Sequence, residues 1–444
     1  MANGKSTHNP DQTPSPSEEE LDRAQSVEWS ELTRAAPAGH LDVAAALRPD
    51  LVRLVDERVK PGSRVGVAVG SRGISRVAEV VHEVVGALRD RGAEPVIIPA
   101  MGSHGGATPA GQTKALRELG VDEAAAGAPV EASMETEEVG RLKGGQAVYV
   151  SKTALGCDAL VPVNRVKPHT DFRAPVESGL TKMLAIGLGK QRGASSIHSA
   201  GFDAFGEVLP EAVQMVLGAL RVPFGVALVE DAWHRLHRVE VVPGEEILER
   251  DKVLLAEALD NFGRLPFGQF DVLVVRDMGK TISGAGMDPN VTGRFTGMAL
   301  AGAPSIRRLA VLDLVESSGG NAIGLGLADI VTERLRSKVD WAATYANALA
   351  SKALHAAKLP FVATTDREAL AFAVASLTGK ARQRQLRLAA MTSTLDVNHI
   401  AVSGPLLEEA TAAGYSVTAS GCRGEFGRDG TLVRIGGLEF FPAP

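Results

Sequence analysis

Cysteine is nearly absent from this sequence. Its 444 residues include only Cys157 and Cys422, which lie far apart and form no CxxC motif. A disulfide framework or a thiolate zinc site is therefore not expected, and a reducing compartment fits best. No apolar run reaches the roughly 18 residues needed to cross a bilayer, and the N-terminus is polar where a signal peptide would be apolar. We expect a cytoplasmic protein with no membrane partner.

The sequence also lacks an excess of positive charge. It has 47 Lys and Arg residues against 53 Asp and Glu residues, with a net charge of -6 at pH 7. Nucleic acid is therefore not an expected partner. The chain contains no HExxH motif, no acidic metal cluster, no Walker loop and no GxSxG elbow. Hydrolytic zinc enzymes, dinuclear metal enzymes, nucleoside triphosphatases and serine hydrolases thus have no motif in their favour.

What the sequence does contain is 45% hydrophobic residues, enough for two or three domains with their own cores. Residues 1–28 are rich in Ser, Pro, Thr, Asp and Glu, and they are predicted to form a disordered tail. Pro and Gly in the segment LPFGQF mark a joint near residue 263. We expect an N-terminal α/β domain at residues 29–262 and a C-terminal α/β domain at residues 263–444.

Short apolar strands alternate with helical patterns along both halves of the chain. A strand starts at Val65, residues 74–90 have helical spacing with Ser75 as a plausible N-cap, and EPVIIPA follows as a second strand. Together they predict a βαβ unit. Further strands are predicted at 158–166, 223–231, 270–277, 307–315 and 360–366, and helices at 205–220, 252–262, 322–336, 342–356, 367–375 and 380–390.

The loops after the first two strands carry polar side chains among glycines. Ser71, Arg72 and Gly73 follow the first strand, where loop amides and a guanidinium can bind a phosphate or carboxylate. An ordinary tight turn is the alternative interpretation. His104 follows the second strand in GSHGGA, among small residues that give it little to pack against. We consider this imidazole a candidate acid or base.

Residues 163–198 form a second group of candidates. This segment reads VNRVKPHTDFRAPVESGLTKMLAIGLGKQRGASSIH, and its basic side chains include Arg165, Lys167, His169, Lys182, Lys190 and His198. Taken singly, Lys182 could extend along an apolar surface and His198 could cap a helix or pack in the core. So many basic groups beside apolar neighbours favour a functional site instead.

These segments resemble the nickel-pincer lactate racemase superfamily, as a divergent subgroup. The resemblance rests on VAVGSRGI, GSHGGAT, the 163–198 segment and GKTISGAGMDPNVTGR, and it covers most of residues 45–440. It implies two α/β domains with a cofactor cleft between them, which the C-terminal domain closes. The implied activity is the racemisation or epimerisation of a 2-hydroxy acid by reversible hydride transfer.

The resemblance also implies a cofactor and its ligands. The cofactor is nickel in a pyridinium-3-thioamide-5-thiocarboxylic acid mononucleotide, supplied by cofactor-biosynthesis proteins of the host. Lys182 matches the lysine of covalent attachment and His198 matches the nickel ligand, for which a neutral imidazole is well suited. His104 and His169 match the two acid/base residues, because each face of the substrate needs one proton acceptor.

Further residues are expected to contact the cofactor or the substrate. The candidates for the anionic groups of the cofactor are Ser71, Arg72, Gly73 and Lys167. Arg72 is also a candidate for the substrate carboxylate. The candidates for substrate contacts in the C-terminal domain are Asn290, Arg294 and Trp341. A Gly- and Pro-rich turn around Asn290, and ordinary core packing of Trp341, are the alternative interpretations.

Other functions remain open. The same scaffold could carry an epimerase of a sugar acid or another bulky hydroxy acid, or a cofactor-free protein that binds anions or carboxylates. A nicotinamide dehydrogenase is less favoured, because the loop GSRGIS does not match GxGxxG. The presence of both Lys182 and His198 favours the cofactor-dependent enzyme.

Overall fold

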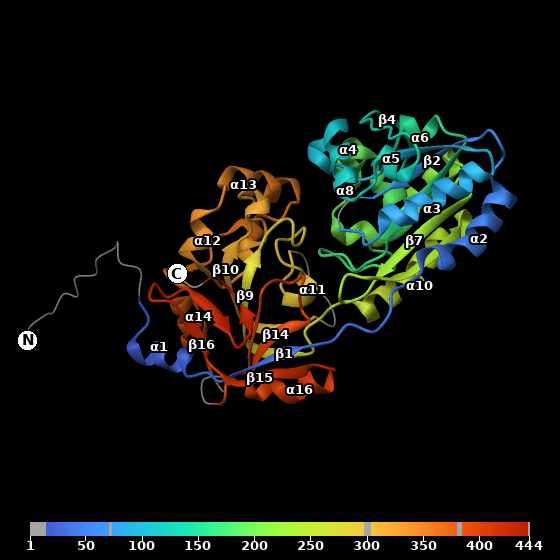
Figure 1. Cartoon of the computed structure of the whole chain (residues 1–444). Helices are drawn as coiled ribbons and strands as arrows, with labels where there is room; N and C mark the ends of the chain where they lie inside the picture. The colour runs from blue at the N-terminus through green and yellow to red at the C-terminus, as the bar shows by residue number, and fades with distance from the viewer. Residues whose placement is uncertain (1–14, 71–72, 297–302, 380–383, 443–444) are drawn as a thin grey trace, which may run out of the picture. The chain divides into compact units, whose positions relative to one another are not determined.

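The computed structural model describes residues 15–70, 73–296, 303–379 and 384–442. Chain contacts separate two compact units (Figure 1). The N-terminal unit runs from Ala36 to Gly263, and the C-terminal unit combines the segment up to Ala35 with the chain from Arg264 onward. Both units are α/β, as the sequence predicts. In the described parts of the chain, no helix is long and apolar enough to span a membrane.

A five-stranded sheet forms the centre of the N-terminal unit, in the order β3-β2-β6-β7-β8. Its strands are β2 (Arg64–Val69), β3 (Glu94–Pro99), β6 (Ala159–Arg165), β7 (Phe224–Glu230) and β8 (Leu236–Pro243). The first four strands in this order are parallel, and β8 is antiparallel to β7. Their nearly continuous buried apolar residues are typical of strands that are covered on both faces.

Helices cover both faces of this sheet. Successive side chains of a strand point to opposite sides, so neighbouring strand residues belong to two different cores. Val67 and Val161 belong to a core with α2 (Val43–Arg58), α3 (Val77–Asp90), α4 (Pro109–Glu118) and α5 (Glu123–Ala126). Ala68 and Leu160 belong to a core with α7 (Gly179–Lys182), the π-helical turn η2 (Met183–Gly187), α8 (Lys190–His198), α9 (Phe205–Ala219) and α10 (Ile247–Asn261). The smaller elements are η1 (Gly105–Ala107), β4 (Thr136–Arg141), β5 (Ala147–Ser151), α6 (Lys152–Leu155), η3 (Phe202–Ala204) and η4 (Gly244–Glu246).

An eight-stranded mixed sheet forms the C-terminal unit, in the order β12-β11-β10-β9-β13-β14-β1-β15. The parallel strands are β9 (Gln269–Met278), β10 (Ser305–Leu314), β11 (Ile330–Thr332), β12 (Phe361–Ala363) and β13 (Leu388–Met391). The antiparallel strands are β14 (His399–Ser403), β1 (Trp29–Thr33) and β15 (Ser416–Cys422). A small sheet contains β16 (Gly424–Phe426), β17 (Leu432–Ile435) and β18 (Leu438–Glu439). The helices include α11 (Pro289–Thr292), α12 (Glu333–Ser337), α13 (Trp341–Ala350), α14 (Asp366–Ala375) and α16 (Leu407–Ala412), and the short turns are η5 (Glu316–Ser318), η6 (Leu325–Leu327), η7 (Leu354–Ala357) and η8 (Gly404–Leu406).

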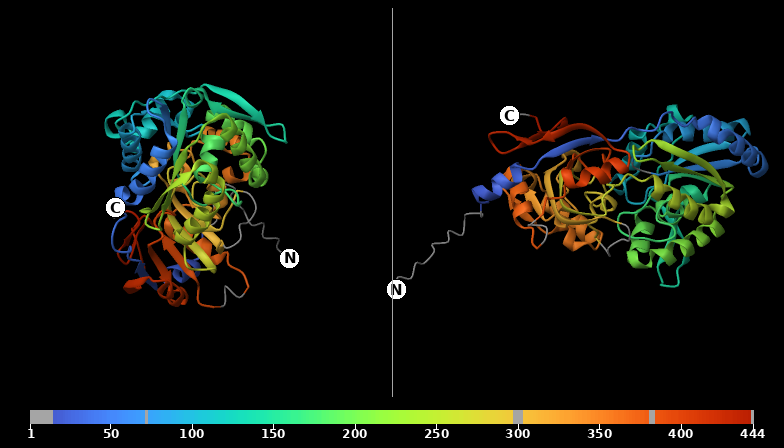
Figure 2. Two further views of the ribbon diagram at one scale, coloured as in Figure 1. Left: turned by 90° about the vertical axis from the view of Figure 1, so that its right-hand side faces the viewer. Right: turned by 90° about the horizontal axis from the view of Figure 1, so that it is seen from below.

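The prediction of a disordered tail is wrong for residues 15–28, the part of that segment that the structure describes. α1 (Glu18–Gln25) begins with a capping box, in which the Glu20 amide donates to Ser17 Oγ at 3.3 Å and the Ser17 amide donates to Glu20 Oε2 at 2.8 Å. α1 packs on α14 and buries Ala24. β1 then pairs with β14 and β15, so residues 29–35 belong to the C-terminal unit and not to the first domain (Figures 1 and 2). Pairing over such sequence distances leaves no local signal.

Three local predictions also need correction. The predicted helix at 322–336 contains η6 and β11, and only its end is helical, as α12. The predicted helix at 380–390 ends in β13, a buried central strand of the sheet, although residues 380–383 lie outside the described part. Ser75 does not cap α3, because Arg76 is the N-cap residue and the Ser75 amide donates to Glu230 Oε1 at 2.7 Å. In each case tertiary packing overrides a local pattern.

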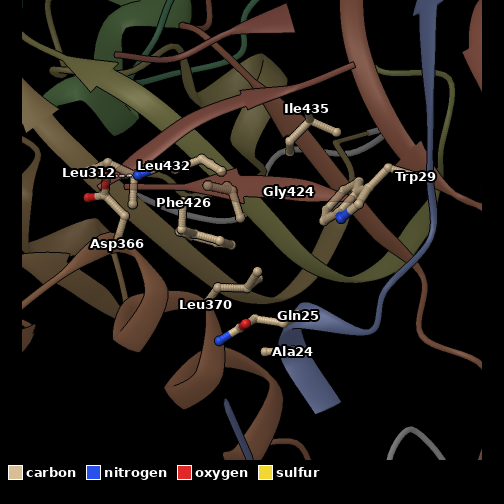
Figure 3. Close-up of a pocket in the computed structure, with 11 residues that line it drawn as sticks. Ala24, Gln25, Trp29, Leu312, Asp366, Leu370, Gly424, Phe426, Leu432 and Ile435 are labelled. Atoms are coloured by element: carbon tan, nitrogen blue, oxygen red, sulfur yellow. Dashed lines mark hydrogen bonds between the residues drawn. The ribbon is translucent and has the colours of Figure 1, made fainter. Parts of the chain in front are cut away.

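The C-terminal unit contains a small apolar cavity (Figure 3). Its lining includes Trp29, Val274, Leu312, Leu370 and Phe426. The cavity offers about 10 Å³, which is roughly the room for one water molecule. It is therefore far too small for a nucleotide or a hydroxy acid.

Candidate functional site

The candidate site lies at the carboxyl edge of the five-stranded sheet. β3 and β6 flank β2 on opposite sides, so the order in which strands are added reverses here. In open α/β sheets, ligands bind outside the carboxyl ends of the strands at such a switch point. The loops after β2, β3 and β6 carry Gly73, His104 and His169, respectively. All three loops therefore belong to one edge.

Buried Glu177 organises the loop after β6. Its side chain is 2% exposed, and Oε2 accepts hydrogen bonds from the His169 amide at 2.7 Å and from Arg173 Nη1 at 3.0 Å. Oε1 accepts from the Ala174 amide at 3.2 Å. Burial raises the pKa of Glu177, while these donors act in the opposite direction. The carboxylate thus fixes the backbone of His169 and holds Arg173 within the loop.

His169 has a defined tautomer in this loop. Its side chain is 17% exposed, and Nδ1 accepts a hydrogen bond from the Asp171 amide at 3.1 Å. The proton of the neutral ring is therefore assigned to Nε2. Burial, followed by the charges of Lys182 and Lys167, holds the pKa of His169 well below 6.5. Neutral His169 presents an N–H donor at Nε2, and it can accept a proton only after the bond to Asp171 breaks.

Lys182 ends α7, a single turn that is capped from another helix. Asp251 of α10 is 1% exposed and accepts hydrogen bonds from the amides of Leu180 at 3.3 Å and Thr181 at 2.7 Å. Burial raises the pKa of Asp251 to about 6, although these hydrogen bonds lower it. Lys182 Nζ lies 5.5 Å from the centroid of the Phe172 ring. The chain continues into η2, and π-helical turns are frequent at functional sites.

His198 ends α8 and has the opposite tautomer. Its Nδ1 lies 2.6 Å from the carbonyl oxygen of Ala194, which can only accept, so the ring proton is assigned to Nδ1. Nε2 then carries the lone pair. Burial lowers the pKa of His198, the bond to Ala194 raises it, and the charge of Lys182 lowers it. His198 is thus a neutral imidazole whose Nε2 can bind a metal.

Three phenylalanines join these residues into one group. The ring centroid of Phe172 lies 4.4 Å from that of His169, and the centroids of Phe202 and Phe205 lie 5.8 Å and 5.4 Å from that of His198. The ring centroids of Phe172 and Phe205 lie 5.0 Å apart. The structure therefore brings together the predicted attachment lysine, the predicted metal ligand and one of the two predicted acid/base residues, against an aromatic wall.

His104 lies on a loop that packs against the same segment. The Gly102 amide donates to the carbonyl oxygen of Gly187 in η2 at 3.0 Å, and a Cβ on Gly102 would lie 3.6 Å from Cβ of Ala194 in α8. The His104 amide donates to the Met101 carbonyl at 3.1 Å. This loop is thus attached to the segment that carries both Lys182 and His198.

The predicted anion loop is described only in part. Ser71 and Arg72 lie outside the described residues. Gly73 has a φ of 46°, which favours glycine, and its carbonyl oxygen accepts from Arg165 Nη1 at 2.8 Å. The Lys167 amide donates a hydrogen bond to Ser178 Oγ at 2.7 Å, and Ser178 Oγ donates to the Lys167 carbonyl oxygen at 2.6 Å. Lys167 lies two residues before His169 in the loop after β6, and its charge lowers the pKa of His169.

The three candidates of the C-terminal unit are engaged within that unit. Asn290 is 5% exposed, and both its amide and its Nδ2 donate to Asp288 Oδ1, at 2.9 Å and 2.8 Å. Arg294 Nη2 donates to Asp329 Oδ2 at 2.7 Å. The rings of Trp341 and Tyr345 are 5.5 Å apart. The substrate contacts predicted for Asn290, Arg294 and Trp341 stay predictions.

Some residues of the site were missed by sequence reasoning. Glu177 and Asp251 are buried carboxylates that bond to backbone amides, and Phe172 and Phe202 line the aromatic wall. The sequence signal for Glu177 is an acidic residue inside a basic, apolar segment. Asp251 lies in an ordinary amphipathic helix about seventy residues from its partners, so it has no comparable signal.

The described residues contain no group of three or more His, Cys, Asp and Glu side chains that could hold a metal ion. A metal at His198 would thus have fewer than three such side chains as donors among the described residues.

The chain is similar to a protein family and to solved structures of low sequence identity. A family model described as a domain of unknown function, DUF362, matches residues 43–242, which include every described candidate from Gly73 to His198. No curated protein matches the sequence. A structure of a Thermotoga maritima protein from a structural genomics consortium has 12% identity and a TM-score of 0.49, covering 81% of this chain and 89% of its own. The lactate racemase apoprotein of Thermoanaerobacterium thermosaccharolyticum has 14% identity and a TM-score of 0.41, covering 81% of this chain and 79% of its own.

Proposed function

We propose that this protein is a racemase or epimerase of a 2-hydroxy acid that works with a nickel-pincer nucleotide attached to Lys182. The observation that carries the proposal is the group formed by Lys182, His198 and His169 against one aromatic wall. It combines the amine of Lys182, the lone pair at Nε2 of His198 and the N–H donor at Nε2 of His169 in a partly buried environment.

The residues present fit the proposed cofactor. The Lys182 amine, beside the ring of Phe172, would form the covalent link. Nε2 of His198 would serve as the single protein ligand of nickel, because the bond from Nδ1 to Ala194 holds the lone pair at Nε2. Lys167 would add positive charge for the phosphate and carboxylate groups. When bound, the cofactor would accept a hydride from the substrate carbon and return it.

The side chains of this protein would then handle the proton and exclude water. His104 is the proposed acceptor of the hydroxyl proton. His169, with its proton on Nε2, is proposed to donate a hydrogen bond to the same substrate oxygen and stabilise its developing charge. Phe172, Phe202 and Phe205 would keep water from the reacting carbon. Inversion requires the planar keto acid to be reduced from its other face, where His169 would handle the proton once the bond from the Asp171 amide to Nδ1 breaks.

The test uses intact mass, peptide mapping and nickel content of protein from a host that makes the pincer cofactor. Wild type should carry added mass on Lys182 and about one nickel per chain, whereas Lys182→Ala should carry neither. Lys114→Ala serves as the matched control, because that side chain is 76% exposed on α4. Loaded protein is then screened by chiral chromatography for inversion of 2-hydroxy acids.

An unmodified and nickel-free wild type from such a host would refute the proposal. The basic residues of the same edge would then favour the cofactor-free alternative, a protein that binds anions or carboxylates. Calorimetric titration with 2-hydroxy acids and inorganic phosphate measures that activity directly.

A further inference from the structure

Lys190 is the most unusual basic residue of the N-terminal unit. It is 0% exposed, and its Nζ donates to the carbonyl oxygen of Pro99 and to Gln112 Oε1, the latter at 3.1 Å. Both acceptors are uncharged. Burying a lysine against neutral acceptors is costly, because the desolvation of the charge is only partly offset.

The backbone of Lys190 adds a second cost. Its φ is 53°, in the left-handed region that side chains other than glycine rarely adopt. This conformation costs on the order of 1 kcal/mol and persists only where the surrounding structure requires it. It occurs at the start of α8, directly after Gly189, and it directs the chain from η2 into the helix that ends at His198.

Gln112 continues the contact from Lys190 to the loop of His104. It is also 0% exposed, and its Nε2 donates to the carbonyl oxygens of Gly102 at 2.9 Å and of His104 at 3.4 Å. One end of the amide thus accepts from the lysine while the other end holds two carbonyls of the loop. Lys190 holds the start of the same loop through Pro99.

The loop has little room to adjust by itself. A Cβ on Gly187 would lie 2.5 Å from the carbonyl oxygen of Ala100, and a Cβ on Gly105 would lie 2.5 Å from the Gly111 backbone. The loop therefore lies against η2 on one side and against the first turn of α4 on the other. Its position depends on a few buried polar contacts, and those of Lys190 and Gln112 are among them.

We propose that Lys190 and Gln112 are positioning residues that hold the backbone of His104 against the segment carrying Lys182 and His198. The contribution to turnover rests on the function proposed above, whereas the effect on the loop does not. Pre-organisation of this kind matters because a catalytic group displaced by about 1 Å can lose roughly a hundredfold in rate.

The test compares Gln112→Glu and Lys190→Met with wild type, and uses Lys114→Met as an exposed control. Glutamate keeps an oxygen for Lys190 but has no N–H for the carbonyls of Gly102 and His104. Hydrogen exchange, followed by mass spectrometry, measures residues 100–107 separately from β2 and β6. We expect exchange in 100–107 to rise roughly tenfold or more in both variants, with β2 and β6 within about twofold of wild type. Should Lys190→Met fail to fold, Gln112→Glu decides.

Kinetics of loaded protein give a second readout. Gln112→Glu should keep the added mass on Lys182 and lose kcat by roughly tenfold to a hundredfold, with KM changed far less. The inference is overturned if exchange in 100–107 is unchanged, or if it rises equally throughout the unit, as a purely structural role predicts. If loaded wild type inverts no hydroxy acid, the proposed function fails, and hydrogen exchange still decides the inference about the loop.

Discussion

Replacing Asp251 with asparagine tests how burial controls the site, because this carboxylate caps the turn that ends in Lys182. Burial raises the pKa of Asp251 from 3.8 to about 6. A shift of about two units corresponds to roughly 3 kcal/mol. The folded state binds this proton more tightly than the unfolded chain does, so stability falls as pH rises from 3.8 to about 6. Above this pH range the folded protein bears the full loss of stability from burying the ionised carboxylate, and below the range this loss is absent.

Asparagine is neutral at every pH, so Asp251→Asn removes this dependence. The free energy of unfolding of Asp251→Asn, minus that of wild type, should increase by roughly 3 kcal/mol between about pH 4 and about pH 7. Asparagine has only one oxygen for the two amides of Leu180 and Thr181, so its N–H₂ group faces one of these donors. The resulting loss of stability is similar at each pH. It therefore cancels when the free energies of unfolding at the two pH values are compared.

The assay is a urea titration in which hydrogen exchange of peptides from residues 36–263 monitors unfolding. The free energy of unfolding then refers to the N-terminal unit. Asp260→Asn is the matched control, since Asp260 is an exposed residue of the same helix. A difference between Asp251→Asn and wild type that is equal at the two pH values would refute the assigned effect of burial on this carboxyl.

Four further predictions follow from the same contacts. His198→Ala should lose nickel by roughly tenfold or more while the mass on Lys182 remains, and full nickel content would remove His198 from the ligands. His104→Ala should unfold like wild type and lose kcat by roughly a hundredfold to ten-thousandfold, so an unchanged rate would make His104 structural. Burial lowers the pKa of Lys190 from 10.5 to about 8, so stability should rise with pH across that window in wild type and not in Lys190→Met; parallel pH curves would contradict this. Glu177→Gln should lower the free energy of unfolding by about 1–3 kcal/mol in urea titrations, because Arg173 loses its carboxylate, and an unchanged midpoint would argue against that ion pair.

The tautomer of His169 bears on the acid/base role that the sequence predicts for it. The sequence favours an acid/base role, because histidine titrates near neutral pH. The hydrogen bond from the Asp171 amide to Nδ1 depends on the conformation of the loop after β6, which no sequence pattern specifies. With this bond in place, His169 is better suited to donate a hydrogen bond than to accept a proton.

The sequence by itself determined the α/β character of both units, four of the five strands of the N-terminal sheet and three of the eight strands of the C-terminal sheet. Buried parallel strands are nearly continuous apolar runs, and such runs can be recognised without knowledge of their partners. It also identified the segment that carries Lys182 and His198, because basic residues among apolar neighbours are rare outside sites. The strand ends pointed to one edge of the sheet, since parallel strands expose their carboxyl ends together.

Only the tertiary structure decided which distant parts meet. β1 joins a sheet made mainly from residues beyond 264, and Asp251 caps a turn about seventy residues earlier in the chain. Lys190 and Gln112 meet inside the core over a similar separation. Such contacts depend on packing between elements and on the burial of polar groups, and both arise only when the chain is folded. The tautomers of His169 and His198 depend instead on the local backbone, through the Asp171 amide and the Ala194 carbonyl oxygen, and residue type alone does not set them.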